Sequence, residues 1–172
     1  MPTSKTRDCN RPFPLLLRAR VREESGQSLL ELALTLPMLF VMLIGAVEFG
    51  RLAYASIEIA NAARAGTAYG SLSLINAADI TGMQNAATQD GLDVTKWKTT
   101  GLTATAQELC ACSNSPTTLI TCTAAATTCV SPVRTLVFVK VSTTATIDPL
   151  FYVPLLPKSY VLSSQAIMRS PQ

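Results

Sequence analysis

The order of apolar and polar residues along the chain predicts a long helix whose first part lies in a membrane. The run from Leu32 to Val47 is apolar and holds no charged residue, and the lone carboxylate of Glu31 stands directly before it. The 23 residues from Ser25 to Val47 contain Glu31 as their single ionisable residue. A bilayer core needs about 20 residues of helix, so this stretch is long enough to span one if Glu31 lies at or near an interface. Beyond it, apolar residues recur at spacings of three and four with charged residues between them. This predicts that the helix continues as an amphipathic helix and ends at Gly66 or Gly70.

The pattern changes after this helix. A second, short helix is predicted over Ala77–Asp90, because Asn76 can cap its start and Gly91 follows its end. Ile80, Met83 and Ala87 would share one face of it. Threonine, valine and alternating apolar positions then predict an antiparallel sheet of three or four strands. The segments with this pattern are Trp97–Cys112, Thr135–Ile147 and Tyr160–Met168.

Two segments are expected to be loops. Residues 113–132 are rich in threonine and alanine and offer little to pack. Residues 149–157 hold three prolines among large apolar residues, which is typical of a rigid loop and not of a strand. We expect the large side chains of this second loop to cover the sheet; if exposed, they would suit a protein partner. They are Phe151, Tyr152, Leu155 and Leu156.

Together these elements predict an α+β fold. It consists of a long N-terminal helix that changes from transmembrane to amphipathic, a second short helix and a small antiparallel sheet. Such a sheet needs one face covered, and the outer half of the long helix and the second helix are the available covers. We divide the chain into a basic leader (1–26), the transmembrane and amphipathic helix (27–66) and an α+β domain (67–172).

Charge gives the predicted orientation. Residues 1–25 hold six basic and three acidic residues, while the rest of the chain is balanced. A basic flank predicts a cytoplasmic N-terminus and an exported C-terminal domain. The net charge of +3 is too small to indicate nucleic acid binding. A cleaved secretory signal is the alternative, since Ala53-Tyr54-Ala55 has the small-x-small form of a cleavage site. Glu48 and Arg51 before that site, and the long charged leader, disfavour it.

The cysteines indicate disulfides. Cys9 lies in the leader, and four more fall close together in the domain that we expect to be exported: Cys110, Cys112, Cys122 and Cys129. In an oxidising compartment four clustered cysteines predict two bridges. Three pairings are possible, and we expect Cys110 and Cys112 each to bond to Cys122 or Cys129, because cysteines two apart pair only with strain.

Other chemistry is disfavoured. The chain has no histidine, and a C-x-C spacing fits zinc poorly, so we expect neither a metal nor another cofactor. A thiol oxidoreductase would need Cys110 and Cys112 to be reducible and reactive, and no supporting fold pattern accompanies them. A hydrolase would need a base, and the acids show no paired spacing. We therefore expect no enzymatic activity.

Glu31 admits two interpretations. Ser28-x-x-Glu31 matches a capping box, in which two side chains bind free backbone N–H groups at the start of a helix. Alternatively, a carboxylate at a membrane segment is costly and invites a positive partner. No basic residue follows until Arg51, so the partner would come from another chain or from a new terminus. Pro37 lies inside the helix and should kink it or loosen its first turns.

The residues around Glu31 resemble a known processing site. Gly26-x₄-Glu31, placed between a basic leader and an apolar helix, is similar to the site in type IV pilin-like proteins. In that family a prepilin peptidase cuts after the glycine on the cytoplasmic face, and the glutamate becomes the fifth residue of the mature chain. There it neutralises the N-terminal ammonium of a neighbouring subunit. The resemblance implies cleavage between Gly26 and Gln27, with Gln27 supplying the amine.

Three segments resemble TadE-like proteins in particular, which are minor pseudopilins of the tight-adherence (Tad/Flp) pilus system. They are Gly26–Pro37, Glu48–Arg51 and Asn61–Gly70. The resemblance implies a pilin-like fold, a single-pass inner-membrane protein with a periplasmic or extracellular domain, and a structural or initiating role in pilus assembly. It implies as partners a prepilin peptidase, other pilins or pseudopilins, Tad assembly proteins and inner-membrane lipids. The alternative is a signal-anchored periplasmic binding or adhesion domain unrelated to pili, which would keep its N-terminus intact.

Overall fold

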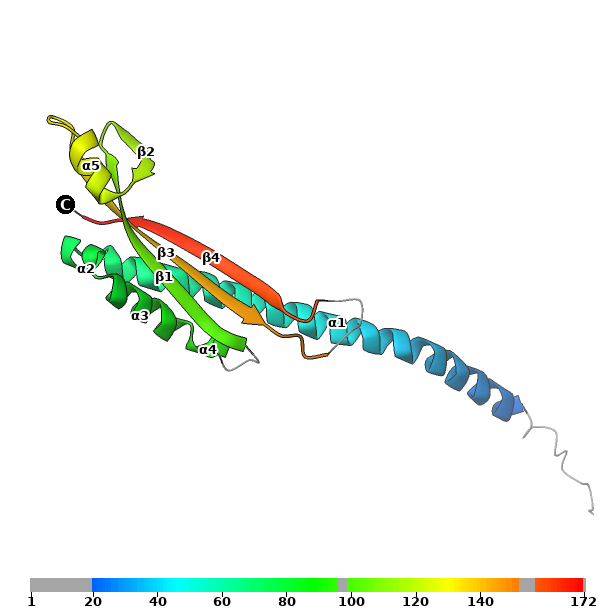
Figure 1. The fold of residues 1–172 in the computed structure, drawn as a ribbon. Coiled ribbons are helices and arrows are strands. Elements are labelled where there is room, and N and C mark those ends of the chain that lie inside the picture. The colour runs from blue at the N-terminus through cyan, green and yellow to red at the C-terminus, as the bar shows by residue number, and fades with distance from the viewer. Residues whose placement is uncertain (1–19, 96–98, 152–156, 172) are drawn as a thin grey trace, which may run out of the picture. The chain divides into compact units, whose positions relative to one another are not determined.

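A computed structural model describes residues 20–95, 99–151 and 157–171 (Figure 1). The chain divides into two units, with the boundary between Ala46 and Val47. Each unit is described by itself. Most of the predicted leader, residues 1–19, lies outside the described residues.

Helix α1 runs from Arg20 to Gly70 and belongs to both units. It therefore ends at the second of the two predicted glycines but begins before the predicted start at Gln27. The residues that precede Gln27 include arginine and glutamate, which form helices readily, and one glycine costs only about 1 kcal/mol inside a helix. The helix also continues through Pro37. Just before this proline, the hydroxyl of Thr35 donates to the carbonyl of Glu31 at 3.0 Å.

The outer part of α1 presents small residues to the domain. Beyond Arg51, its buried side chains are Ala55, Ile59, Ala62, Ala63 and Thr67. Gly66 lies so close to the next helices that a Cβ atom there would come within 2.8 Å of the carbonyl oxygen of Met83. The spacing predicted an amphipathic face formed by Phe49, Leu52, Ala53, Ser56, Ala60 and Ala63. Of these only Ala63 is buried, so the predicted face is wrong, and α1 packs against the domain through a different, close-packing face.

Three short helices follow: α2 (Leu74–Ala78), α3 (Ile80–Asp90) and α4 (Leu92–Thr95). The single predicted helix over 77–90 is therefore wrong in its first turn, and Asn76 is not the cap of the main helix. Asp79 interrupts the helix because its carboxylate accepts from the N–H of Gly82 at 2.8 Å and so caps α3. Tyr69 on α1 donates to the other oxygen of the same carboxylate at 2.9 Å.

The sheet has four antiparallel strands in the order β2-β1-β3-β4 (Figure 1). Three of them match the predicted strands: β1 (Thr99–Cys112), β3 (Thr135–Ile147) and β4 (Tyr160–Arg169). Trp97, where the first strand was predicted to begin, lies outside the described residues. Strand β3 is central, as its apolar run indicates, and its residues alternate between buried and partly exposed positions.

The segment predicted as a loop at 113–132 holds two elements, so that prediction is wrong. They are β2 (Ser115–Ile120) and α5 (Cys122–Thr128). Thr121 between them caps α5, its hydroxyl accepting from the N–H of Ala124 at 3.4 Å. The segment has few large apolar side chains. Pairing with β1, the Thr121 cap and covalent bonds hold these elements in place, together with the buried Ala125 of α5.

The core lies between the sheet and the helices, as predicted for the covered face. One cluster joins α2 and α3 to β1 and β3 through Ala77, Met83, Ala87, Ala106, Val139 and Val141. A second cluster joins Ile59 on α1 to Val94 and Ala145. Between them the buried hydroxyl of Thr143 donates to the carbonyl of Ile59 at 2.8 Å. This bond fixes the central strand against the outer part of α1.

Candidate functional site

The predicted processing residues lie on an open stretch of α1. Gly26 and Gln27 are exposed, and a Cβ atom built on Gly26 would meet no atom within 4 Å. Nothing in the described structure covers this peptide bond from the side of Gly26. The position of the predicted cut is therefore accessible along the helix surface, while cleavage itself stays a prediction.

Glu31 is exposed one turn beyond Gln27. Its carboxylate accepts from the side-chain amide of Gln27, with 3.5 Å between Nε2 and Oε1. The capping-box interpretation is wrong for this chain, because α1 begins at Arg20 and Ser28 lies inside the helix, not at its first residue. Arg51, the next basic residue along the chain, is bonded to Glu48. The structure thus leaves Glu31 with a neutral neighbour in its own helix.

The apolar run forms an uncovered helix surface. Of the described residues, one helix is long and apolar enough to cross a membrane, and its most apolar window has no residue buried inside the structure. Leu34 and Val41, for example, are 72% and 71% exposed. Apolar surface on this scale is unfavourable in water. The exposed apolar helix is consistent with a single-pass membrane protein.

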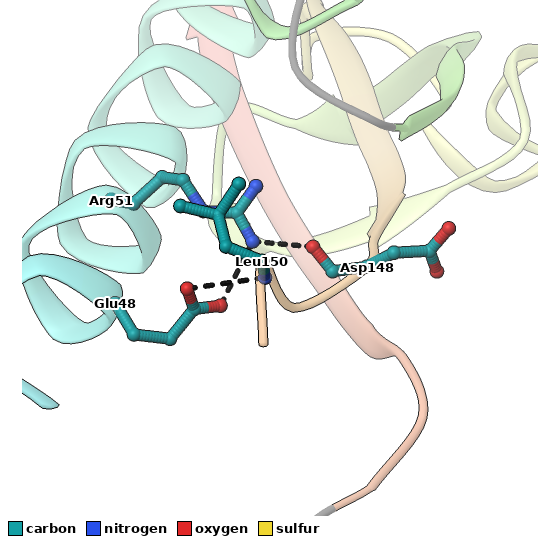
Figure 2. A network of polar contacts seen from close by, with 4 residues as sticks. All are labelled: Glu48, Arg51, Asp148 and Leu150. Atoms are coloured by element: carbon teal, nitrogen blue, oxygen red, sulfur yellow. Dashed lines mark hydrogen bonds and ion pairs between the residues drawn. The ribbon is translucent and has the colours of Figure 1, made fainter. Parts of the chain in front are cut away.

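A polar network lies where the second unit begins (Figure 2). Arg51 is only 5% exposed. Its guanidinium forms an ion pair with Glu48 at 2.8 Å and donates to the backbone carbonyl of Asp148. The other carboxylate oxygen of Glu48 accepts from the backbone N–H of Leu150 at 3.3 Å. The charged side chains of Glu48 and Arg51 on α1 therefore hold the loop that follows β3.

Only an indirect signal in the sequence points to this network. The segment Glu48–Arg51 is one of those that carry the family resemblance. Its two charged residues are three positions apart, a spacing that allows an ion pair within one helix. Their partners are backbone atoms in a segment far along the chain, and no side-chain pattern marks backbone acceptors or donors. Within the described structure the Nε atom of Arg51 is buried without a hydrogen-bond partner.

The loop held by this network is exposed where it is described. Leu150 and Phe151 are 46% and 53% exposed. The expectation that the large side chains of this loop cover the sheet is therefore wrong for Phe151, because the network holds the loop by backbone atoms of Asp148 and Leu150 and the Phe151 side chain is half exposed. Tyr152, Leu155 and Leu156 lie outside the described residues.

The four clustered cysteines form two disulfides. Cys110 bonds to Cys122 and Cys112 bonds to Cys129, with Cα atoms 4.8 and 5.3 Å apart. Each cysteine of the C-x-C pair thus bonds to one of the two later cysteines, as expected, and the structure selects one of the pairings that the sequence left open. Both bridges tie the end of β1 to the two ends of α5. Among the described residues, no three His, Cys, Asp or Glu side chains are grouped so that they could hold a metal ion.

Comparison with known proteins adds one finding. No curated protein and no solved structure matches the chain. A family model described as TadE-like protein matches residues 26–68. The match begins at the predicted processing glycine and includes Glu31, the apolar run and the pair Glu48–Arg51. The chain is thus TadE-like over this segment, which confirms the resemblance seen in its sequence and is consistent with a component associated with the Tad pilus.

Proposed function

We propose that this chain is a minor pseudopilin, a structural or initiating component in the assembly of a Tad/Flp-type pilus, without enzymatic activity. It crosses the inner membrane once, with a cytoplasmic N-terminus and a periplasmic or extracellular domain. The observation that carries the proposal is that the TadE-like match begins at Gly26 and runs without a break into the exposed apolar helix. Its partners are a prepilin peptidase, other pilins or pseudopilins and Tad assembly proteins.

Processing is the first step of the proposed function. A prepilin peptidase hydrolyses the bond between Gly26 and Gln27, which removes residues 1–26 and leaves an α-amino group on Gln27. A peptide bond inside a helix must become extended before a peptidase can reach it. Glycine lowers the cost of that local unwinding, because it is about 1 kcal/mol less favourable in a helix than alanine. Gly26 also has open space around it, so the scissile bond lies at a weak and accessible point of α1.

Assembly is the second step. The new α-amino group has an ordinary pKa of about 8, so it is protonated at neutral pH. The carboxylate of Glu31 then pairs with the ammonium group of a neighbouring subunit. Each charge alone would be costly beside an apolar core, and pairing offsets that cost. The uncovered apolar surface of the helix contacts lipid before assembly and the helices of other subunits afterwards.

The test is the intact mass of the protein purified from membranes of cells with and without the prepilin peptidase. We expect loss of residues 1–26 only when the peptidase is present. An intact N-terminus in both strains would contradict the proposal and favour a signal-anchored domain unrelated to pili. Cleavage after Ala55 in both strains would show that the apolar helix is a secretory signal.

A further inference from the structure

Exposed apolar side chains lie on α1 and on the loop tied to it, at the level where the second unit begins. Val47 and Phe49 lie on the helix, and Phe49 is 76% exposed. Leu150 and Phe151 lie on the loop after β3 and are also exposed. We call these four residues the apolar collar. Large apolar residues grouped at one level of a domain mark a surface that water does not cover in the working protein.

The network of Figure 2 fixes the level of the loop relative to the helix. The N–H of Leu150 bonds to Glu48, and the carbonyl of Asp148 bonds to Arg51. A helix rises 1.5 Å per residue, so the helical residues from Val47 to Arg51 span only about 6 Å along the axis. The loop is therefore held beside the first turn after the apolar run, although it is remote in sequence.

The charges at this level are arranged so that an apolar environment can approach. Arg51 and Glu48 are the charged residues of this turn, and their ion pair is largely buried, with side-chain exposures of 4% and 17%. The pair therefore presents little net charge at the surface. Asp148 and Lys158, at the two ends of the β3–β4 connection, are exposed. Exposed side chains of opposite charge are compatible with the headgroup layer of a bilayer, where the charged end of a lysine side chain extends toward water.

We infer that the apolar collar lies in the interfacial layer of the same bilayer that α1 spans, so that Phe151 and Leu150 enter the lipid beside the helix. The inference rests on the membrane span of the proposed function. The apolar run ends at Val47 and the collar begins there, so the collar lies where the helix leaves the hydrocarbon. Aromatic residues gather at this depth, and apolar side chains of surface-bound segments reach about 5–10 Å into the boundary layer. The loop gives the domain a second attachment to the membrane.

The experiment measures the depth of residue 151 in the full chain. The protein is reconstituted into vesicles of phosphatidylethanolamine and phosphatidylglycerol, with Phe151→Trp introduced into a chain that carries Trp97→Phe. Lipids brominated near the glycerol or near the chain ends quench tryptophan fluorescence by contact. We expect Phe151→Trp to lose fluorescence with the shallow bromolipid and to lose less with the deep one. If circular dichroism shows that Trp97→Phe does not fold, the signal of a chain with Trp97 alone is subtracted instead.

Two matched variants separate the outcomes. Val130→Trp, at another exposed apolar position remote from the network, should show no quenching by either lipid. Leu39→Trp, inside the apolar run, should be quenched by the deep bromolipid. Quenching of Leu39→Trp without quenching of Phe151→Trp would overturn the collar inference alone, whereas absence of quenching at Leu39→Trp would overturn the membrane span. If the emission of the Phe151→Trp variant is blue-shifted but is not quenched by either bromolipid, protein and not lipid covers this residue. That result would also overturn the inference.

Discussion

Glu31 is the residue whose role depends most on what happens to its neighbours. In the full-length chain it is a helix-surface carboxylate with the Gln27 amide beside it. After cleavage at Gly26 the same turn would contain a free ammonium group. A residue that resembles a helix cap in the sequence is therefore proposed to act in assembly.

Replacing Glu31 with alanine should separate processing from assembly. We expect Glu31→Ala to be cleaved normally, since the peptide bond after Gly26 is unchanged, and to support few pili, since the ammonium group of its neighbour loses its partner. Intact mass reports cleavage, and counting pili by electron microscopy reports assembly. The matched control is Gln27→Ala, which keeps both the carboxylate and the new amine. Normal pili from a stable Glu31→Ala protein would refute the assembly role.

Arg51 should matter for stability more than any exposed arginine of the same helix. Arg51→Ala leaves the partly buried carboxylate of Glu48 and the carbonyl of Asp148 without their donor. Leaving a buried acceptor without its donor costs about 1–3 kcal/mol. Glu48 keeps the N–H of Leu150 and Asp148 is exposed, so the two groups together should not exceed this range. We expect a loss of about 1–3 kcal/mol in the free energy of unfolding, measured by urea titration of the detergent-solubilised protein. Arg64→Ala, at an exposed position of α1, should change stability by less than about 0.5 kcal/mol. Equal effects of the two variants would show that the network is not a structural anchor.

At the scale of elements, the close packing of α1 against α3 depends on a missing side chain. A Cβ atom at Gly66 would lie 2.8 Å from a backbone oxygen that cannot rotate away. Gly66→Ala should therefore destabilise the domain by about 1–3 kcal/mol, the usual cost of overpacking. Gly50→Ala on the same helix meets open space and should stabilise it by about 0.5–1 kcal/mol, because alanine favours helix more than glycine does. Thermal unfolding of the two variants compares them directly, and a stabilising Gly66→Ala would contradict the packing described here.

The two disulfides should hold β2 and α5 and little else. We expect the native protein, alkylated without reductant, to add no label at the four domain cysteines and to add four labels after reduction. Cys112→Ser with Cys129→Ser should lower stability by about 3 kcal/mol on the chain-entropy model. Hydrogen exchange should quicken in α5 and remain slow in β3. Labelling of Cys110 and Cys112 in the unreduced protein would support a redox role instead.

The elements that the sequence predicted well are those whose burial shows in their own pattern. The sequence of β3 is apolar because the strand is central. The outer half of α1 has the three- and four-residue spacing of a helix, and one of its faces is buried. Elements held by other means escaped prediction. The break at Asp79 depends on a carboxylate that also binds Tyr69, and α5 depends on two covalent bonds and a threonine cap. The prediction that the side chains of the loop at Leu150 cover the sheet was wrong, because the network holds the backbone of the loop and not its side chains.

At the scale of the whole molecule, the chain divides its tasks along its length. Residues 26–68 hold the TadE-like match, and the sheet and disulfides lie beyond it. The segments to which we assign processing, membrane crossing and assembly are thus contiguous, and the rest of the chain builds a folded domain upon them. Among the described residues, the network at Glu48 and Arg51 ties the matched segment to the loop after β3, and Thr143 ties it to the central strand through the carbonyl of Ile59. The folded domain is therefore attached to the matched segment at more than one level of the helix.

The orientation of the chain in the membrane is the last expectation that follows from this division. Six basic residues precede the apolar run and the remainder of the chain is balanced, so the positive-inside rule places the leader in the cytoplasm. In cells that lack the prepilin peptidase, so that the leader stays attached, protease added outside spheroplasts should digest the C-terminal domain and spare a tag at the N-terminus. The control is a variant in which Arg18, Arg20 and Arg22 are replaced by glutamine, which should insert in both orientations and leave part of the domain protected. Full protection of the domain in the unmodified chain would contradict its export. The disulfides would then lie in a reducing compartment, where bridges of this kind do not persist, so the same result would also require the four cysteines to be free.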